Sequence, residues 1–240
     1  MHAEHQALLQ QLHAASRAEG RLAAQAYLGT GSSSLNVSVP ARRKIARAWR
    51  AAHKDWPTAQ VLALVDGLVA GDTHEEKTLG LLILESLGPT RRPFGPAEVD
   101  RWLDHLVGWA EVDSLCQSLF GPEDLLGDWP AWSASIRRLA GDPNINKRRA
   151  ALVLLTRPAR TSPDPRLLQL AFEVIDRLKG EKPIIITKAV SWLLRSLADQ
   201  HPQAVGAYLA AERDSLPKIA IRETRAKLTT GRKTKAKAAG

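Results

Sequence analysis

Residues 61–87 read VLALVDGLVAGDTHEEKTLGLLILESL. Apolar side chains recur in this stretch three or four positions apart, as at Val61, Leu64, Val65 and Leu68, and no segment alternates for long with a period of two. Such spacing places the apolar side chains on one face of an α-helix. The same spacing returns at Leu8, Leu9 and Leu12, at Ile45, Ala48 and Trp49, at Leu79, Leu82, Ile83 and Leu87, and at Leu152, Val153 and Leu155. The sequence therefore predicts one helix after another and an all-α fold.

Prolines divide this helical pattern at short intervals. They stand at or just before the predicted helix starts: Pro40, Pro57, Pro89, Pro96, Pro122, Pro130, Pro143, Pro165, Pro183, Pro202 and Pro217. Proline suits a first turn because its missing N–H would have no partner there, and Ser38, Asp142 and Asp164 are placed to cap the helices that follow. Helices of about 10–16 residues joined by short turns are typical of stacked helical pairs. We therefore expect a HEAT-like helical-repeat solenoid, with an irregular helical bundle as the structural alternative.

The chain of 240 residues is strongly basic. Its 34 Lys and Arg against 25 Asp and Glu give a formal net charge of +9 and a pI near 10.0. This balance favours a polyanionic partner, nucleic acid first, although a solvated basic surface is the alternative. The single cysteine, Cys116, excludes a disulfide framework within one chain, and the seven histidines show no metal-ligand spacing. We therefore expect no metal site.

Neither the start of the chain nor its longest uncharged stretch indicates a membrane. The first residues, MHAEHQALLQQLHAA, lack the basic start and apolar core of a signal peptide. The stretch from Leu22 to Ala41 carries no Lys, Arg, Asp or Glu, but its centre reads GTGSSSLN, which a bilayer would not accept. We expect a soluble protein with no membrane partner.

Two segments interrupt the helical rhythm. Residues 29–39 are small and polar, and they predict an ordered loop. Residues 229–240 read TTGRKTKAKAAG, a composition low in apolar residues and rich in Lys that predicts a disordered tail. Four of the nine net charges lie in this tail, which could add nonspecific attraction to phosphates or have no role. The predicted organisation is a single HEAT-like repeat domain over residues 1–228 and a basic tail over residues 229–240.

Trp109 and Asp113 form the first candidate for chemistry. Four positions separate them, so on a helix they share a face. An aromatic wall beside a carboxylate suits a site that handles a cationic, sugar-like transition state. The structural alternative is a core tryptophan followed by an aspartate that caps a helix or interacts with its dipole.

Two helix starts carry unusual positive charge. Lys147, Arg148 and Arg149 follow Asn146, and a similar run of Arg42, Arg43 and Lys44 follows Pro40. Cations at a helix start oppose the helix dipole, so a bound phosphate would explain them, since it accepts both side-chain and helix-terminal donors. An exposed basic turn is the structural alternative for both segments.

A third segment combines an aromatic side chain with cations. Lys188, Trp192 and Arg195 occupy positions i, i+4 and i+7, which lie on one helical face. A tryptophan between two cations is typical of a nucleic-acid surface. A buried tryptophan flanked by surface charges is the structural alternative.

Together, these segments resemble the AlkD-type DNA alkylation-repair glycosylases over residues 5–228. The order and spacing of the motifs agree with the family, although each motif is short. The family's Pro-x-Arg-Arg matches Pro40 to Arg43, its Trp-x-x-x-Asp-Ser matches Trp109 to Ser114, its Arg-Ala-Ala matches Arg149 to Ala151, its Lys-Ala-x-x-Trp-x-Leu-Arg matches Lys188 to Arg195, and an aromatic of its early helix matches Tyr27.

The resemblance implies HEAT-like helical pairs curved into a concave basic groove that holds duplex DNA. It implies hydrolysis of the N-glycosidic bond of cationic alkylated purines, chiefly 3-methyladenine and 7-methylguanine, without a metal or cofactor and without the base flipping that most base-acting enzymes use. The partner would be duplex DNA containing alkylated bases. We expect a monomer in the cytoplasm, associated with a bacterial nucleoid.

The resemblance also implies roles for individual residues. Asp113 would be the catalytic carboxylate, which stabilises positive charge on the deoxyribose and orients the attacking water. Trp109 and Trp192 would line the sugar and the backbone, each contributing about 0.5–2 kcal/mol to binding of the cationic centre. Arg149 would hold a phosphate near the lesion, and Tyr27 would pack against the duplex.

This chain departs from the family pattern directly after the first tryptophan. The family often has a second aromatic and an acid there, whereas this chain has Ala110 and Glu111. Two other functions stay open at this stage: a HEAT-like DNA-binding protein without catalysis, and a protein-interaction scaffold, which is the common role of HEAT solenoids.

Overall fold

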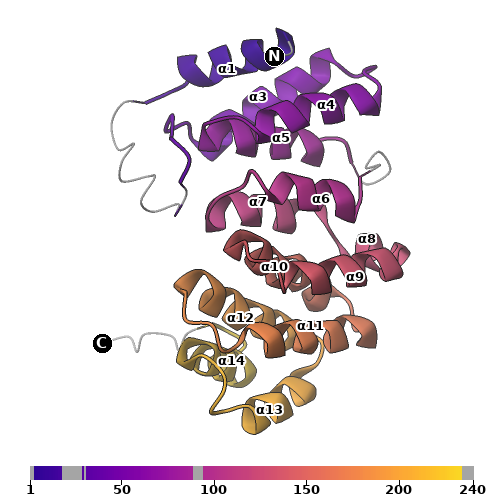
Figure 1. Ribbon diagram of the computed structural model, residues 1–240, viewed down its shortest axis with the longest axis vertical. Coiled ribbons are helices and arrows are strands. Elements are labelled where there is room, and N and C mark those ends of the chain that lie inside the picture. Colours follow the sequence, from indigo (N-terminus) through magenta and orange to yellow (C-terminus); the bar gives the residue numbers. More distant parts are fainter. Residues whose placement is uncertain (1–2, 18–28, 30, 89–93, 234–240) are drawn as a thin grey trace. The chain divides into compact units, whose positions relative to one another are not determined.

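The computed structural model describes residues 3–17, 29, 31–88 and 94–233. Within these residues the regular structure is α-helical apart from an isolated bridge between Ser33 and Thr73, which confirms the predicted all-α fold. The chain divides into two compact units, unit 1 (Met1–Leu119) and unit 2 (Phe120–Gly240). Figure 1 shows the helices of each unit. The single HEAT-like domain over residues 1–228 stays a prediction.

In unit 1, one helix forms the centre of the packing. The helices are α1 (Ala3–Ala14), α3 (Val39–Ala52), α4 (Thr58–Val69), α5 (His74–Glu85), α6 (Pro96–Leu103) and α7 (Trp109–Leu119). α5 packs against α3, α4 and α7, and nearly all of its side chains are buried (Figure 1). Gly80 permits the close approach to α4, because a Cβ there would lie 3.1 Å from the Cβ of Leu68.

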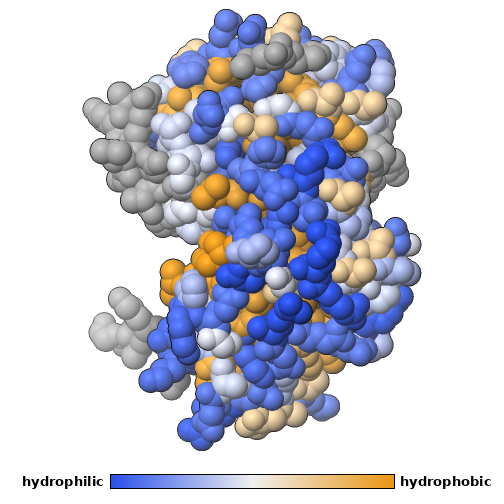
Figure 2. Space-filling view, viewed as in Figure 1, coloured by the Kyte–Doolittle hydropathy of each residue, from blue (hydrophilic) through white to orange (hydrophobic). Residues whose placement is uncertain are grey.

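In unit 2, a row of three helices forms the core. The helices are α8 (Pro122–Gly127), α9 (Trp129–Leu139), α10 (Ile145–Thr161), α11 (Pro165–Leu178), α12 (Ile184–Leu197), α13 (Pro202–Ala211) and α14 (Lys218–Thr230). α12 lies between α10 and α14 and packs against both (Figure 1). The segment Ala150 to Leu155 of α10 is fully buried. On the face drawn in Figure 2, strongly hydrophilic side chains gather over α9 and α10.

Most of the predicted helix starts agree with the structure. Pro40, Pro96, Pro122, Pro130, Pro165 and Pro202 stand in first turns, and Pro57, Pro183 and Pro217 occupy N-cap positions. Ser38 and Asp164 accept backbone hydrogen bonds as caps. The cap predicted at Asp142 is wrong, because Asn144 caps α10 and Asp142 instead accepts from the Asn144 N–H at 2.8 Å. Pro89 lies outside the described residues.

The two segments predicted to interrupt the helices are shorter than expected. The loop ends where α3 begins at Val39, and Leu35 and Val37 bury their side chains within it. The predicted tail begins too early, because α14 continues to Thr230 and Gly231 ends it with a left-handed φ of 69°. Among the described helices, none has both the length and the apolar character needed to cross a bilayer.

Candidate active site

A pocket of about 360 Å³ opens in unit 1 between α3, α5 and α7. Its lining includes Arg42 and Arg43 from α3, His74 and Thr78 from α5, and Trp109 and Asp113 from α7. Four of these six residues are site residues predicted from the sequence. Pro40 is exposed in the first turn of the same α3 that supplies the two arginines.

Trp109 and Asp113 share a face of α7, as their spacing predicts. Both are half-buried and line the same pocket, one turn of helix apart. The edge of the indole faces Gly29, where a Cβ would lie only 3.0 Å from Cδ1 of Trp109. Gly29 has a φ of +60°, a conformation that glycine adopts without strain. A glycine at this position therefore lets the loop pack directly against the tryptophan.

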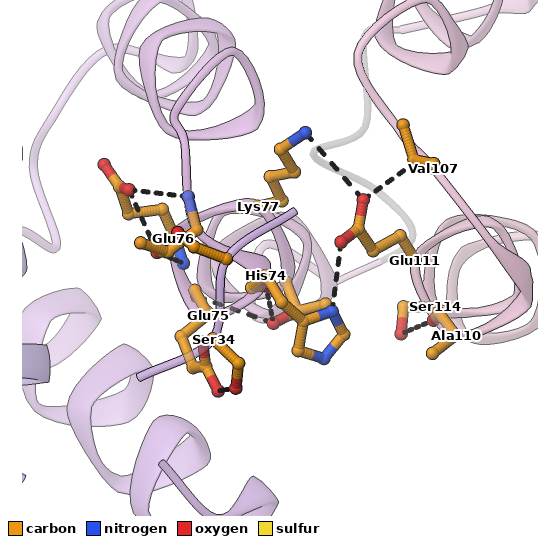
Figure 3. A network of polar contacts seen from close by, with 12 residues as sticks. Ser34, His74, Glu75, Glu76, Lys77, Val107, Ala110, Glu111 and Ser114 are labelled. Atoms are coloured by element: carbon orange, nitrogen blue, oxygen red, sulfur yellow. Dashed lines mark hydrogen bonds and ion pairs between the residues drawn. The ribbon is translucent and has the colours of Figure 1, made fainter. Parts of the chain in front are cut away.

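A fully buried carboxylate holds the start of α7. One oxygen of Glu111, Oε2, accepts from the Val107 N–H at 2.9 Å and lies 3.9 Å from Nζ of Lys77, and the other, Oε1, accepts from Nδ1 of His74 at 3.2 Å. Figure 3 shows Glu111 reaching from α7 toward His74 and Lys77 of α5. A buried charge requires such partners, so the contacts of Glu111 fix α7 against α5 next to Asp113.

Arg42 continues this network beneath the pocket. It is only 7% exposed, and its NH1 group donates to Oγ1 of Thr78 and to Nε2 of His74 at 3.4 Å. Because arginine can only donate, Nε2 of His74 accepts and Nδ1 carries the proton that is donated to Glu111. Burial lowers the pKa of Arg42, and the nearby charge of Glu75 opposes that change. The guanidinium therefore stabilises the interior, and its contact with a phosphate stays a prediction.

A second buried carboxylate holds the loop that precedes α3. Glu75 accepts from the Ser34 hydroxyl at 3.0 Å, from the Leu35 N–H at 2.8 Å and from the Val37 N–H at 3.3 Å. These hydrogen bonds fix the loop on α5, and Gly29 of the same loop packs against Trp109. The position of the tryptophan therefore depends on contacts made by α5.

A smaller pocket of about 190 Å³ lies in unit 2 around Trp192. Its lining includes Arg160, Trp192, Arg195, Asp199, Lys227 and Lys233. The structure thus places Trp192 and Arg195 in one pocket, in agreement with the shared face predicted from the sequence. Lys188, one turn before Trp192, is exposed and does not line this pocket.

Two cations of the Trp192 pocket pair with one buried carboxylate. Glu223 of α14 accepts from the Ser191 hydroxyl at 2.7 Å and lies 3.4 Å from Nε of Arg195 and 3.6 Å from Nζ of Lys233. Burial lowers the pKa of Arg195, and the charge of Glu223 opposes that change. Lys227 pairs with Asp199 at 2.6 Å. The pocket keeps an excess of positive charge, which suits an anion such as a phosphate.

The basic start of α10 is directed largely into the protein. Lys147 and Arg149 are 6% and 4% exposed, and Arg149 donates to the carbonyl of Ile185 at the start of α12. Arg148 pairs with Glu181 at 2.7 Å and donates to two backbone carbonyls. These contacts account for Arg148 and Arg149 without a ligand, and the binding of all three cations to phosphates stays a prediction.

Sequence reasoning missed several residues that complete the two pockets. His74 and Thr78 gave no signal, because their partner Arg42 precedes them by 32 and 36 positions. Lys233 was assigned to the tail, yet it lines the Trp192 pocket. Tyr27 lies outside the described residues. In the described part of the chain, no group of three or more His, Cys, Asp or Glu side chains is arranged to hold a metal ion.

Comparisons with known proteins agree with this architecture. A solved structure described as a predicted DNA alkylation repair enzyme from Enterococcus faecalis is similar, with a TM-score of 0.63 and 17% sequence identity over 90% of this chain and 97% of that chain. At that identity the likeness shows the fold alone. No curated protein matches. The family model described as DNA alkylation repair enzyme matches residues 8–228, and the chain therefore belongs to the family of DNA alkylation repair enzymes.

Proposed function

We propose that this protein is a DNA glycosylase that hydrolyses the N-glycosidic bond of cationic alkylated purines in duplex DNA. Its substrates would be 3-methyladenine and 7-methylguanine, which it would release without flipping them out of the helix. The observation that carries the proposal is the pocket of unit 1, where Asp113 and Trp109 line one face of α7. Membership of the DNA alkylation repair family supports it independently.

The reaction requires little catalytic assistance from the enzyme at the departing base. The alkylated purine is already positively charged, so when the bond to C1′ breaks, its electron pair neutralises the base and the base leaves. Positive charge then develops on the deoxyribose. A fixed carboxylate in a partly desolvated pocket stabilises that charge, and water adds to C1′ and loses a proton to leave an abasic site. Asp113 would supply the carboxylate and orient this water.

The other site residues would bind the damaged strand. The indole of Trp109 would face the sugar in the unit 1 pocket, and Trp192 would face the backbone from its own pocket in unit 2. Arg43 is exposed and lines the rim of the first pocket, and Arg195 lines the second, where either could contact a phosphate. Lys188, exposed on α12, would contribute to the same charge.

The buried network explains how Asp113 could keep its position. Glu111, two residues earlier on α7, is tied to α5 through His74 and Lys77. A carboxylate that stabilises charge must be fixed before the reaction, because a group that reorients loses part of its effect. The departure from the family pattern at Glu111 thus coincides with an internal contact between α5 and α7.

The test is release of the free base. Purified protein is incubated with a duplex that carries 7-methylguanine, and the free base and the abasic site are measured against the spontaneous rate in the same buffer without protein. We expect release above that rate, and none from undamaged duplex. If the protein binds the duplex but releases no base, the non-catalytic DNA-binding function is correct instead. If it neither binds nor releases, the scaffold function is favoured.

A further inference from the structure

Besides the Trp192 pocket, the described part of unit 2 has a pocket along α14. It is a groove of about 850 Å³ whose floor includes Ile221 and Ala226. Five cations line it: Arg213, Lys218, Arg222, Arg225 and Lys233. Asp214 is the one carboxylate of the lining. We call this surface the α14 groove.

Among the described residues, four of the five groove cations lack the carboxylate partners that several other cations of unit 2 have. Arg137, Arg148, Arg166, Lys179, Arg195 and Lys227 each pair with a carboxylate. Within the described part of the chain, by contrast, no ion pair involves Arg213, Lys218, Arg222 or Arg225, and all four are exposed. Uncompensated like charges side by side repel one another, so their concentration here favours an anionic ligand.

The spacing along α14 suits a repeating anion. Lys218, Arg222 and Arg225 lie at i, i+4 and i+7, on the side opposite to the buried residues Ala220 and Thr224. Seven residues of helix span about 10 Å, which is close to the axial length of three base pairs at about 3.4 Å each. The three side chains can therefore reach phosphates of one strand over about three base-pair steps.

The α14 groove also continues a surface already described. Lys233 lines both this groove and the Trp192 pocket, so the two basic pockets adjoin within unit 2. We infer that the α14 groove binds the sugar-phosphate backbone of duplex DNA next to the nucleotides held at the Trp192 pocket. This inference rests on the proposed function only in taking duplex DNA as the ligand.

The test replaces two groove cations and measures how binding depends on salt. The variant is R222Q/R225Q in the full chain, and the ligand is an undamaged duplex of fixed length and sequence. The slope of the logarithm of the association constant against log salt is negative, and each lost phosphate contact reduces its magnitude by about 0.9, so we expect the magnitude to fall by about 1.8. At low salt the same loss corresponds to binding weakened by at least roughly tenfold.

A matched variant controls for the loss of net charge. R137Q/R177Q removes the same two charges from exposed positions on α9 and α11, which line neither pocket of unit 2 described above. We expect its slope to equal that of the wild-type protein. Equal slopes for R222Q/R225Q and the wild type, or equal losses in both variants, would overturn the inference.

Two further measurements separate the remaining explanations. An acidic helical peptide with apolar residues tests whether the partner is a protein. If the wild type binds this peptide and R222Q/R225Q does not, while both bind DNA equally well, then the groove binds protein and the inference is wrong. Release of 7-methylguanine by R222Q/R225Q should need a higher DNA concentration for half-saturation than release by the wild type, because the variant lacks two groove cations. Failure of the wild type to release the base would refute the proposed glycosylase function but not the binding of DNA at the α14 groove.

Discussion

The pocket of unit 1 and the Trp192 pocket of unit 2 each set a tryptophan beside charged side chains, but the charges are distributed differently. In unit 1 the cations Arg42 and Lys77 are buried among the carboxylates of Glu75 and Glu111, and Asp113 lines the pocket. In unit 2 the carboxylate of Glu223 is buried, while Arg195, Arg160 and Lys233 line the pocket.

This difference separates two tasks that a base-excising enzyme must perform. A carboxylate at the surface of a pocket, with cations beneath it, can stabilise positive charge on a sugar. Cations at the surface, with a carboxylate beneath them, hold a phosphate. Under the proposed function each unit would supply one of these two tasks, and the predictions below test that division, from the largest expected effect to the smallest.

Removal of the buried carboxylate should destabilise unit 1 most. In E111A the His74 ring loses its acceptor and the Lys77 ammonium keeps, among the described residues, only the carbonyl of His105, while both side chains remain buried, and breaking a buried ion pair costs about 3–5 kcal/mol. We expect a loss of that size in the free energy of unfolding, measured by urea denaturation followed by circular dichroism.

A double variant separates the charge from the shape of this site. Combining Glu111→Leu with Lys77→Met removes both charges, so the double variant should be more stable than the sum of the single losses predicts. Additive losses would show that Glu111 and Lys77 are not coupled.

Loss of the negative charge at Asp113 should remove most of the activity. D113N keeps the size of the side chain but not its charge, and a purely electrostatic role predicts a loss of about 10²-fold in base release with duplex binding retained. The measurement is single-turnover release of 7-methylguanine. D55N removes an exposed carboxylate elsewhere in unit 1 and should release base at the wild-type rate. Unchanged release by D113N would exclude Asp113 from the reaction.

The two tryptophans should have intermediate effects. Trp109→Leu and Trp192→Leu each remove a ring that attracts a cationic centre by about 0.5–2 kcal/mol, which is a loss of about 2- to 30-fold in base release. Trp56→Leu is the control, because Trp56 packs against Trp49 and His53 and lines neither pocket. A loss in the control as large as in the other two would mean that the effect arises from stability.

The smallest effect should distinguish a cation on a surface from a buried one. R195Q removes a guanidinium that lines the Trp192 pocket. For duplex binding, the slope of the logarithm of the association constant against log salt should become smaller in magnitude by about 0.9. R42Q removes a guanidinium that is 7% exposed and bonded to Thr78, so it should lower stability and change that slope less than R195Q does. Equal slopes in the two variants would contradict the proposed difference between the exposed cations of unit 2 and the buried cations of unit 1.

The fold could be predicted from the sequence because it depends on local patterns. The three-and-four spacing of apolar residues and the prolines of first turns indicated the helices, and the four-residue spacing of Trp109 and Asp113 placed them on one face. These features involve neighbouring residues on a single helix. The α10 cap was misplaced by two residues because Asp142 and Asn144 are both good capping residues.

The burial of the basic residues could not be predicted in the same way. Arg42 and Arg149 stand at helix starts that the sequence marks as phosphate sites, yet each donates to a neighbouring helix 36 positions later in the chain. The sequence around each arginine does not indicate its partner, because one partner is a threonine hydroxyl and the other is a backbone carbonyl. Only the packing of α3 on α5 and of α10 on α12 decides that these side chains are buried.

Hydrogen exchange in the loop held by Glu75 can be used to follow the stability of the site. The amide protons of Leu35 and Val37 are bonded to a buried carboxylate 40 and 38 positions away, so they exchange with solvent only when the loop leaves α5. Gly29 belongs to the same loop and packs against Trp109. The deuterium uptake of two backbone amides thus measures how often the aromatic wall beside Asp113 loses its support, even in a protein that has no substrate bound.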